Sequence, residues 1–482
     1  MEEEIKTGKG QAASSFIWRF LEKGFTFGTG LLVQIILARI IAPDQYGSLA
    51  IIVTITNFAA LFVQAGVSTA LIQKKEIDGR DIYAVVFLSS IIATVVYGLL
   101  FFLAPVVASF YNYPVLKNGL RVLSLCIFFN AYYSIRVALF QRDLKFKALF
   151  FRCVIPPIIS GIIGIILAVK GFEIWALIIH TLLTSILNCL AVSVKSHFSI
   201  ERRLDRQKVK AIYSFSLKIL ITNLISGICD LLRTLIIGKK YSSEDLAYFD
   251  KGYTYAMYVS QVLKESSSSV ALPILSKKQD DIRNIHDSAR KAIRLIAFSS
   301  FPVFIGLILV SNELIPVLLK EKWVSCIPFF QLFLLMRLLE LLKIIDVQVY
   351  YSIGRSEIQM YYWFGFSLIS TVSVVICAQI STLAVAFAIT VLELVSFIIV
   401  QIISCKVFAY KVSERFRDLF KPTINTLVMA ASITAFSYFA HPGRLIISLI
   451  CKILIGVLSY LLMCLITKDD NITMVMSFIN KK

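Results

Sequence analysis

Apolar runs of about 20 residues recur along this chain, from near residue 16 to residue 467. An apolar helix of that length crosses the roughly 30 Å hydrocarbon core of a bilayer. The composition agrees, because 58% of the 482 residues are hydrophobic and 16% are charged, whereas soluble domains average about 25% charged residues. No stretch has the length and polarity of a soluble domain. The sequence therefore predicts an all-α polytopic membrane protein.

The runs predict about fourteen transmembrane helices, within a range of roughly 12–14. The N-terminal stretch MEEEIKTGKGQAASS is polar and acidic, so we do not interpret it as a signal peptide. The expected spans are 16–38, 46–72, 82–110, 117–141, 148–169, 172–194, 211–237, 247–275, 290–312, 324–351, 358–379, 381–405, 422–440 and 444–467.

Basic residues predict the orientation of these helices. With the N-terminus inside, the inward connections carry about 29 Lys and Arg and the outward connections about 9. The positive-inside rule then places both termini on the cytoplasmic side. The same connections account for most of the net charge of +19. The charge therefore indicates membrane lipid headgroups as neighbours and no nucleic-acid partner.

A faint repeat at an offset of about 201 residues divides the chain. IIAPDQYGSLA (40–50) corresponds to KKYSSEDLAYF (239–249), and VSTALIQKK (67–75) corresponds to SSVALPILSKK (268–278). Parallel repeats of six helices predict two lobes around a central cavity. The expected parts are an N-terminal six-helix lobe over 1–200, a C-terminal six-helix lobe over 201–412, and two extra transmembrane helices with a tail over 413–482.

Charged residues inside the predicted spans are the candidate functional residues. The tenth span contains FLLMRLLELLKIIDVQVYY (333–351), with four charges of alternating sign at three-residue spacing. A charge at the bilayer centre costs at least about 2.5–3.5 kcal/mol, and each Leu or Ile offsets only about 0.3–0.6 kcal/mol. The candidates are Arg337, Glu340, Lys343 and Asp346 of the tenth span, Arg19, Glu22 and Lys23 of the first, Asp230 of the seventh, and Lys264 and Glu265 of the eighth.

Three interpretations of these charges are open. They pair to lock helices together, they belong to an interfacial amphipathic helix, or they line a hydrated and mainly cationic cavity. The tenth span is apolar all the way round, which disfavours an interfacial helix. We favour the cavity, because ionisable residues within a membrane usually mark a transport path. Basic groups from both lobes would suit a multiply charged anion such as a pyrophosphate.

The sequence predicts no covalent chemistry. It contains no phosphate-binding loop GxxxxGK[ST] and no recognisable pairing of a nucleophile with a base. The nine cysteines include no C-x-x-C pair and the four histidines are scattered, so we expect neither a metal site nor a disulfide framework. We therefore expect no enzyme activity, no catalytic residues and no cofactor.

Four segments resemble successive landmarks of bacterial polysaccharide exporters, the lipid-linked oligosaccharide flippases of the multidrug/oligosaccharidyl-lipid/polysaccharide (MOP) superfamily. The resemblance runs in order over roughly residues 14–410. It implies two six-helix lobes, often with two extra helices, that work by alternating access in the bacterial cytoplasmic membrane. The four segments are LARIIAPDQYGSLA (37–50), GVSTALIQKKEID (66–78), YFDKGYTYAMYVSQVLKESSSSVALPILSKKQDD (248–281) and KEKWVSCIPFFQLFLLMRLLE (320–340).

The resemblance also implies a cargo and roles for the charges. The cargo is an oligosaccharide on undecaprenyl diphosphate, turned from the cytoplasmic to the outer leaflet for surface polysaccharide biosynthesis, with a polymerase and glycosyltransferases as partners. Basic cavity residues in such proteins are thought to engage the diphosphate. The matching bases are Arg19, Lys23, Lys264, Arg337 and Lys343, and the acids Glu22, Glu265, Glu340, Asp346 and Asp230 are candidates for charge pairing or for coupling to H⁺ or Na⁺.

Two rival functions remain at this point. A multidrug exporter coupled to H⁺ or Na⁺ would share the scaffold, but it would favour an acidic site for cationic drugs, whereas basic residues are in excess here. A membrane-embedded glycan polymerase or ligase would need a long outer loop for its catalytic residues, and no predicted outward loop is long enough.

Overall fold

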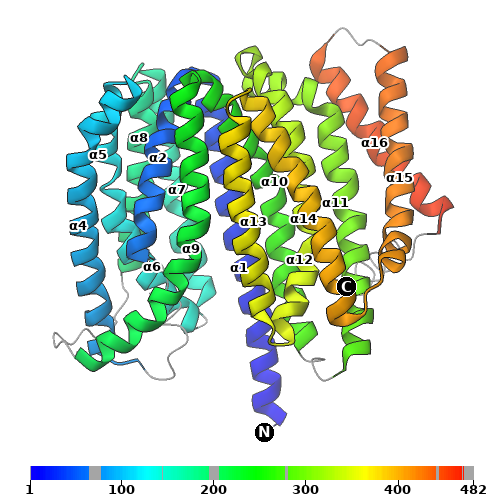
Figure 1. Cartoon of the computed structure of the whole chain (residues 1–482), viewed down its shortest axis with the longest axis horizontal. Helices are drawn as coiled ribbons and strands as arrows, with labels where there is room; N and C mark the ends of the chain where they lie inside the picture. Colours follow the sequence, from blue (N-terminus) through cyan, green and yellow to red (C-terminus); the bar gives the residue numbers. More distant parts are fainter. Residues whose placement is uncertain are drawn as a thin grey trace. The chain divides into compact units, whose positions relative to one another are not determined.

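The computed structural model describes residues 2–64, 77–143, 145–194, 206–276, 281–440, 444–468 and 471, and every regular element within them is a helix. The chain divides into two compact units, residues 1–247 and 248–482. We call them unit 1 and unit 2 and describe each by itself (Figure 1).

Unit 1 is built from nine helices of the described chain, the last of which continues into unit 2. Its helices are α1 (Glu2–Ile40), α2 (Pro43–Gln64), α4 (Gly79–Tyr111), α5 (Val115–Leu123), α6 (Cys126–Arg142), α7 (Phe146–Val169), α8 (Ile174–Ser193), α9 (Arg206–Lys240) and α10 (Ser243–Ser276).

Unit 2 contains most of α10, a short 3₁₀ helix and six further α-helices of the described residues. These elements are α11 (Ile282–Leu319), η1 (Glu321–Cys326), α12 (Ile327–Ser352), α13 (Ser356–Cys377), α14 (Thr382–Phe408), α15 (Val412–Phe439) and α16 (Leu445–Ile466).

The predicted spans fall on these helices. Twelve helical segments of the described residues are long and apolar enough to cross a membrane, with α5–α6 and η1–α12 each forming one span. Helices α9 and α10, with 35 and 34 residues, cover the predicted seventh and eighth spans. Large apolar side chains such as Phe102, Phe364 and Leu458 are more than half exposed, as expected where helices face lipid. The prediction of an all-α polytopic membrane protein is confirmed.

Helix α9 packs within unit 1, against α2 and α4. The Tyr111 hydroxyl of α4 donates to the Leu235 carbonyl at 3.0 Å, and Thr54 of α2 donates to Thr234 at 3.4 Å. These contacts explain why the boundary between the units follows residue 247 and not residue 200. The predicted lobe boundaries at 200 and 412 stay predictions.

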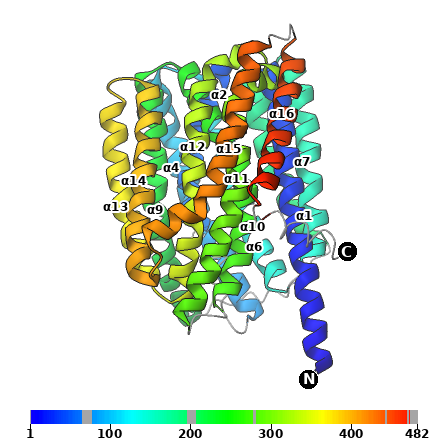
Figure 2. The same ribbon diagram turned by 90° about the vertical axis from the view of Figure 1, so that its right-hand side faces the viewer.

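Helix α11 is the centre of packing in unit 2, because it contacts α12, α15 and α16 (Figure 2). The last two helices bury Met429, Ile433, Tyr460 and Cys464 against apolar residues of α11. The Tyr460 hydroxyl donates to the Phe298 carbonyl of α11 at 2.8 Å. The two extra helices therefore share a core with unit 2.

Close approach of α10 to α12 depends on a glycine. A Cβ added to Gly252 would lie 2.6 Å from the Phe329 Cβ and 2.8 Å from the Phe330 backbone nitrogen. Because backbone atoms cannot yield as a flexible side chain does, any larger residue would push the two helices apart. The contact matters for the charged site, since Tyr253 and Lys264 follow on the same helix.

We expect Gly252→Ala to lower the stability of the purified protein by about 1–3 kcal/mol through overpacking. The matched control is Gly365→Ala in α13, where an added Cβ would meet nothing within 4 Å. Thermal unfolding in detergent, followed by tryptophan fluorescence, measures both. Equal melting temperatures for the two variants would contradict the close approach of α10 and α12.

Candidate functional site

The charged residues of α12 fall into two groups that have different partners. Arg337 donates to one oxygen of Glu340 at 2.6 Å, one helical turn away. Lys264 of α10 donates to the other oxygen of Glu340, also at 2.6 Å. The Arg337 guanidinium lies 4.6 Å from the centroid of the Tyr253 ring, within the range of a cation–π interaction. We call Lys264, Arg337, Glu340 and Tyr253 the cationic cluster.

The cationic cluster carries an excess of positive charge, because two bases share one acid. The Lys264 side chain is 45% exposed and that of Glu340 25% exposed, whereas that of Arg337 is 11% exposed, so Lys264 is the most accessible charge of the cluster. The Nε atom of Arg337 is buried and has no hydrogen-bond partner in the described part of the chain. Buried donors are nearly always paired. The cluster thus has both the charge and a spare donor to bind an anion.

The second half of α12 carries buried ion pairs. Lys343 lies 2.7 Å from Glu393 of α14, with 8% and 12% of the two side chains exposed, and it also hydrogen-bonds Ser396. Asp346 is fully buried and accepts from Nη2 of Arg415 in α15 at 2.8 and 2.7 Å. These two pairs leave no net charge, and they tie α12 to α14 and α15.

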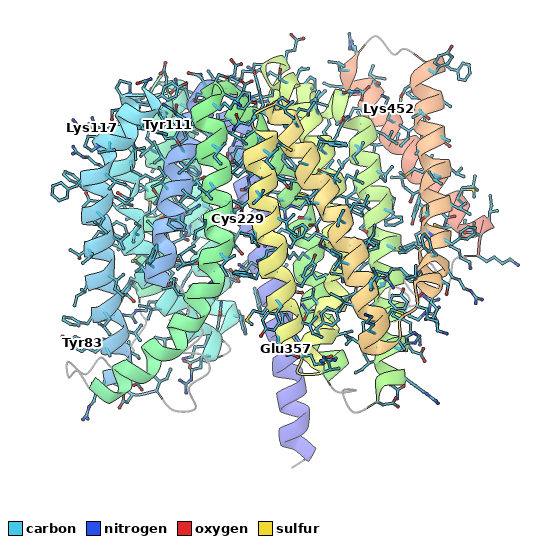
Figure 3. The ribbon with its side chains drawn as sticks, in the orientation of Figure 1. Tyr83, Tyr111, Lys117, Cys229, Glu357 and Lys452 are labelled. Atoms are coloured by element: carbon cyan, nitrogen blue, oxygen red, sulfur yellow. The ribbon has the colours of Figure 1, made fainter. Side chains whose placement is uncertain are left out.

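Further ion pairs join α11 to the last two helices. Arg290 binds both oxygens of Asp418 in α15, at 2.7 and 2.9 Å. Lys452 of α16, labelled in Figure 3, lies 2.5 Å from Glu313 of α11. Because each pair is largely removed from water, removal of one partner would leave an uncompensated charge. These pairs reinforce the shared core of α11, α15 and α16.

Three of the remaining predicted residues, whose side chains are described, belong to unit 1. Glu22 is 5% exposed, and Lys23 lies 5.9 Å from the Phe27 ring centroid on the same helix. Asp230 pairs with Arg233 of its own helix at 2.9 Å and is 56% exposed. The side chains of Arg19 and Glu265 lie outside the described part of the structure. The binding and coupling roles of all these residues stay predictions.

The structure thus brings Lys264, Arg337 and Glu340 together, and it separates Lys343 and Asp346 from them. Sequence reasoning missed the two partners that make this separation, Glu393 and Arg415. The sequence could have identified Glu393, because it is a single acid within the apolar run AVAFAITVLELVSFIIV (384–400). It could not have identified Arg415, because this residue stands beside other charges in SERFRD (413–418) and resembles an ordinary surface residue.

The described residues are expected to hold no metal site. They contain no group of three or more His, Cys, Asp or Glu side chains that could hold a metal ion. The cationic cluster is therefore the strongest candidate site in unit 2, and its chemistry is recognition of an anion through nitrogen donors.

The architecture matches that of known membrane transporters. It is similar to the lipid II flippase MurJ in an inward closed conformation, with a TM-score of 0.78, 18% identity, and 95% of this chain and 100% of that chain covered. It is also similar to an inward-facing multidrug resistance MATE family transporter of the MOP superfamily, with a TM-score of 0.61, 14% identity, and 83% and 98% coverage. The chain is therefore a helical membrane protein with the fold of MOP superfamily transporters.

Sequence comparison defines the family. The profile described as polysaccharide biosynthesis protein matches residues 36–328, and the chain belongs to this family. Teichuronic acid biosynthesis protein TuaB of Bacillus subtilis (strain 168) is 23% identical over 377 residues, which are 78% of each chain. Succinoglycan biosynthesis transport protein ExoT of Rhizobium meliloti (strain 1021) is 22% identical over 456 residues, 94% of this chain and 92% of the relative. Lipopolysaccharide biosynthesis protein WzxC of Escherichia coli (strain K12) is 24% identical over 329 residues, with 67% and 66% covered. The resemblance seen in the sequence is confirmed.

We expect Asp346→Asn to destabilise the protein by about 3–5 kcal/mol, because the buried Arg415 guanidinium would lose its counter-charge. Glu357→Gln is the matched control, since Glu357 pairs with Arg355 at 3.5 Å and both side chains are more than half exposed. That change should cost less than about 1 kcal/mol. Thermal unfolding compares the two variants, and equal losses would refute a structural role for the Asp346–Arg415 pair.

Proposed function

We propose that this protein is a flippase that moves a lipid-linked oligosaccharide across the bacterial cytoplasmic membrane for surface polysaccharide biosynthesis. The observation that supports the proposal is the cationic cluster, in which Lys264 and Arg337 share the single acid Glu340 and the Lys264 side chain is 45% exposed. Membership of the polysaccharide biosynthesis family supports the cargo class. The lipid carrier is undecaprenyl diphosphate, whose two phosphates match the excess positive charge of the cluster.

In this mechanism two acceptors, the Glu340 carboxylate and the diphosphate of the cargo, compete for the same two bases. Without cargo, Glu340 accepts from both Lys264 and Arg337. A diphosphate brings more negative charge than one carboxylate and more acceptor oxygens, so the donors turn towards it. The Nε of Arg337, which is unpaired among the described groups, completes a two-donor contact with a phosphate oxygen pair. The diphosphate is thereby stabilised within the membrane, while the lipid tail stays in the bilayer.

The transport cycle is alternating access, in which the cluster opens first to the cytoplasm and then to the outside. We place both chain termini in the cytoplasm, because this orientation puts about 29 Lys and Arg in the inward connections and about 9 in the outward ones. The polar glycan travels through hydrated protein, since its hydroxyl groups would cost several kcal/mol each in hydrocarbon. An H⁺ or Na⁺ gradient drives the cycle. A polymerase and glycosyltransferases act beside the flippase on the same glycan.

A multidrug exporter is the second candidate, and the fold similarity to a multidrug resistance MATE family transporter favours it. The positive charge of the cluster argues against a multidrug exporter. A cationic drug would meet two bases for one acid, and Coulomb repulsion would oppose its binding. The described cluster therefore suits an anionic cargo better than a cationic one.

The direct test measures lipid-linked sugars by mass spectrometry in cells depleted of this protein, and a membrane-impermeant probe locates them. Completed oligosaccharide on undecaprenyl diphosphate should accumulate on the cytoplasmic face, because its synthesis continues while its export stops. Unchanged levels in a strain that makes surface polysaccharide and lacks a redundant flippase would refute the proposal and favour the drug exporter.

We expect Lys264→Ala and Arg337→Ala each to reduce export about 10–100-fold, since a charged hydrogen bond contributes about 1.5–3 kcal/mol. Lys406→Ala and Arg355→Ala are the matched controls, because both residues are exposed and Arg355 pairs with Glu357 as Arg337 pairs with Glu340. Export is measured as polysaccharide at the cell surface, normalised to the amount of protein inserted in the membrane. Normal export by a Lys264→Ala, Arg337→Ala double variant would remove the cluster from the mechanism.

A further inference from the structure

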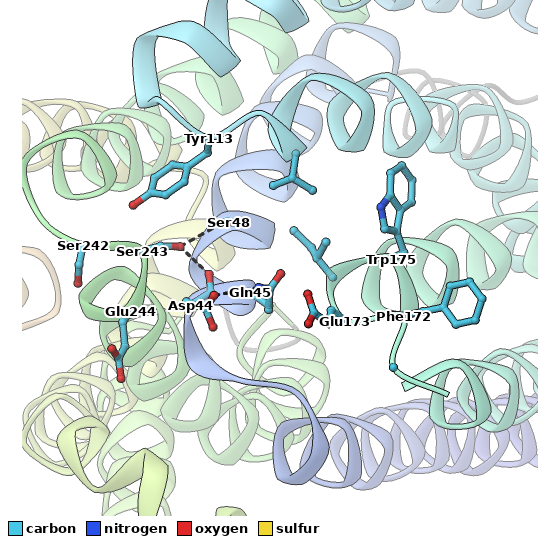
Figure 4. Close-up of a pocket in the computed structure, with 13 residues that line it drawn as sticks. Asp44, Gln45, Ser48, Tyr113, Phe172, Glu173, Trp175, Ser242, Ser243 and Glu244 are labelled. Carbon is cyan, nitrogen blue, oxygen red and sulfur yellow. Dashed lines mark hydrogen bonds between the residues drawn. The ribbon is translucent and has the colours of Figure 1, made fainter. Parts of the chain in front are cut away.

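Unit 1 contains a pocket, which differs in charge from the cationic cluster of unit 2. It has a volume of about 680 Å³, which lies within the usual range for small-molecule sites. It lies at the connections α1–α2, α4–α5, α7–α8 and α9–α10, and residues of the last three connections and of the N-terminal turns of α2, α5, α8 and α10 line it (Figure 4). All four connections run from an odd to an even predicted span, so they lie at one end of unit 1. Under the proposed orientation this end faces the outside of the cell.

The groups that line this pocket are aromatic rings, carboxylates and one amide. Tyr113 and Trp175 supply rings, and Asp44, Glu173 and Glu244 supply acids beside Gln45. No Lys or Arg is among the lining residues, although the chain as a whole has a net charge of +19. The lining therefore repels anions and cannot serve as a second diphosphate site.

Several of these groups have no partner within the described part of the protein. The Glu173 carboxylate, the Tyr113 hydroxyl and the Trp175 indole N–H take part in no hydrogen bond there. Both rings also lack a ring neighbour among the described side chains. Together they offer hydrogen-bond acceptors, donors and open aromatic faces to a ligand. This is the combination that a sugar ring requires, because its hydroxyls pair with carboxylates while its C–H faces lie on aromatic rings.

The pocket is held in shape by its own backbone. Ser243 donates to the Asp44 carbonyl at 2.6 Å and lies 3.1 Å from the Ser48 hydroxyl. A Cβ added to Gly47 would lie 1.7 Å from the Ser243 carbonyl oxygen, so only glycine permits this approach. Glu173 has a φ of 45°, a region that non-glycine residues rarely adopt. The site is therefore preformed, which lowers the entropic cost of binding.

We propose that this pocket binds a neutral or amino-bearing sugar unit of a glycan. Uronic acids and phosphorylated sugars are rejected, because their charge would meet three carboxylates. A divalent cation is the competing occupant, but the described carboxylates do not come together in a group that could hold a metal. The type of ligand, a sugar, is inferred from the residues that line the pocket. Only the source of that sugar, the cargo glycan or its polymer, rests on the proposed function.

Isothermal titration of the purified full-length protein with disaccharides tests the proposal. Cellobiose and maltose represent neutral sugars, a glucosamine dimer represents amino sugars, and digalacturonic acid represents acidic sugars. We expect at least one neutral or amino disaccharide to bind with a dissociation constant of about 1 mM or lower, and digalacturonic acid to bind at least about tenfold more weakly. No binding of any neutral or amino disaccharide, or tightest binding of digalacturonic acid, would overturn the proposal.

Variants locate the binding. Trp175→Ala and Glu173→Gln should each weaken it about tenfold, equivalent to about 1.4 kcal/mol, whereas Trp175→Phe should retain most of it because a ring remains. The controls are Trp363→Ala in α13 and Glu321→Gln in η1, which lie outside the pocket. Thermal unfolding confirms that each variant is folded. Wild-type affinity in the folded Trp175→Ala protein would overturn the assignment.

Two further ligands distinguish the source of the sugar. One is the oligosaccharide released by mild acid from the lipid-linked precursors of the same strain, and the other is a fragment of its finished surface polymer. Tighter binding of the first supports a site for arriving cargo, and tighter binding of the second supports a site for polymer. Neither ligand carries a lipid diphosphate. A negative result here would therefore overturn only the sugar pocket, and the flippase proposal would still be tested separately by the accumulation of lipid-linked oligosaccharide.

Discussion

The structure of unit 2 depends on the need to pair each charge that a helix carries into the membrane. An unpaired charge in hydrocarbon costs at least about 2.5–3.5 kcal/mol. Helix α12 carries four charged residues. Each has a counter-charge within 3 Å on its own or a neighbouring helix, in the pairs Arg337–Glu340, Lys343–Glu393 and Asp346–Arg415. Since the partners come from α14 and α15, satisfying these charges also determines which helices surround α12.

The two extra helices are consequently part of the charged network. Arg415 of α15 reaches the fully buried Asp346, and Asp418, one turn further along, binds Arg290 of α11. A transporter core that lacked α15 would leave Asp346 without its cation. We infer that α15 supports the cationic cluster by holding α12 in place.

The chain separates two kinds of recognition by charge. The cationic cluster of unit 2 has two bases for one acid and suits a diphosphate. The pocket of unit 1 has three acids, aromatic rings and no base among its lining residues, and it suits sugar hydroxyls. A lipid-linked oligosaccharide carries both chemistries in one molecule.

The sequence by itself determined the class of fold, the approximate limits of the spans, their number within a range of roughly 12–14, and the charged residues of α12. Those inferences rest on local properties, since an apolar run or a charge within it is visible without its neighbours. It did not separate Lys343 and Asp346 from the cationic cluster, because their partners Glu393 and Arg415 lie 50 and 69 residues further along the chain. It also did not reveal the pocket of unit 1, whose lining lies at four short connections. Only the tertiary structure decided these points, because helix packing, and not sequence position, sets which side chains meet.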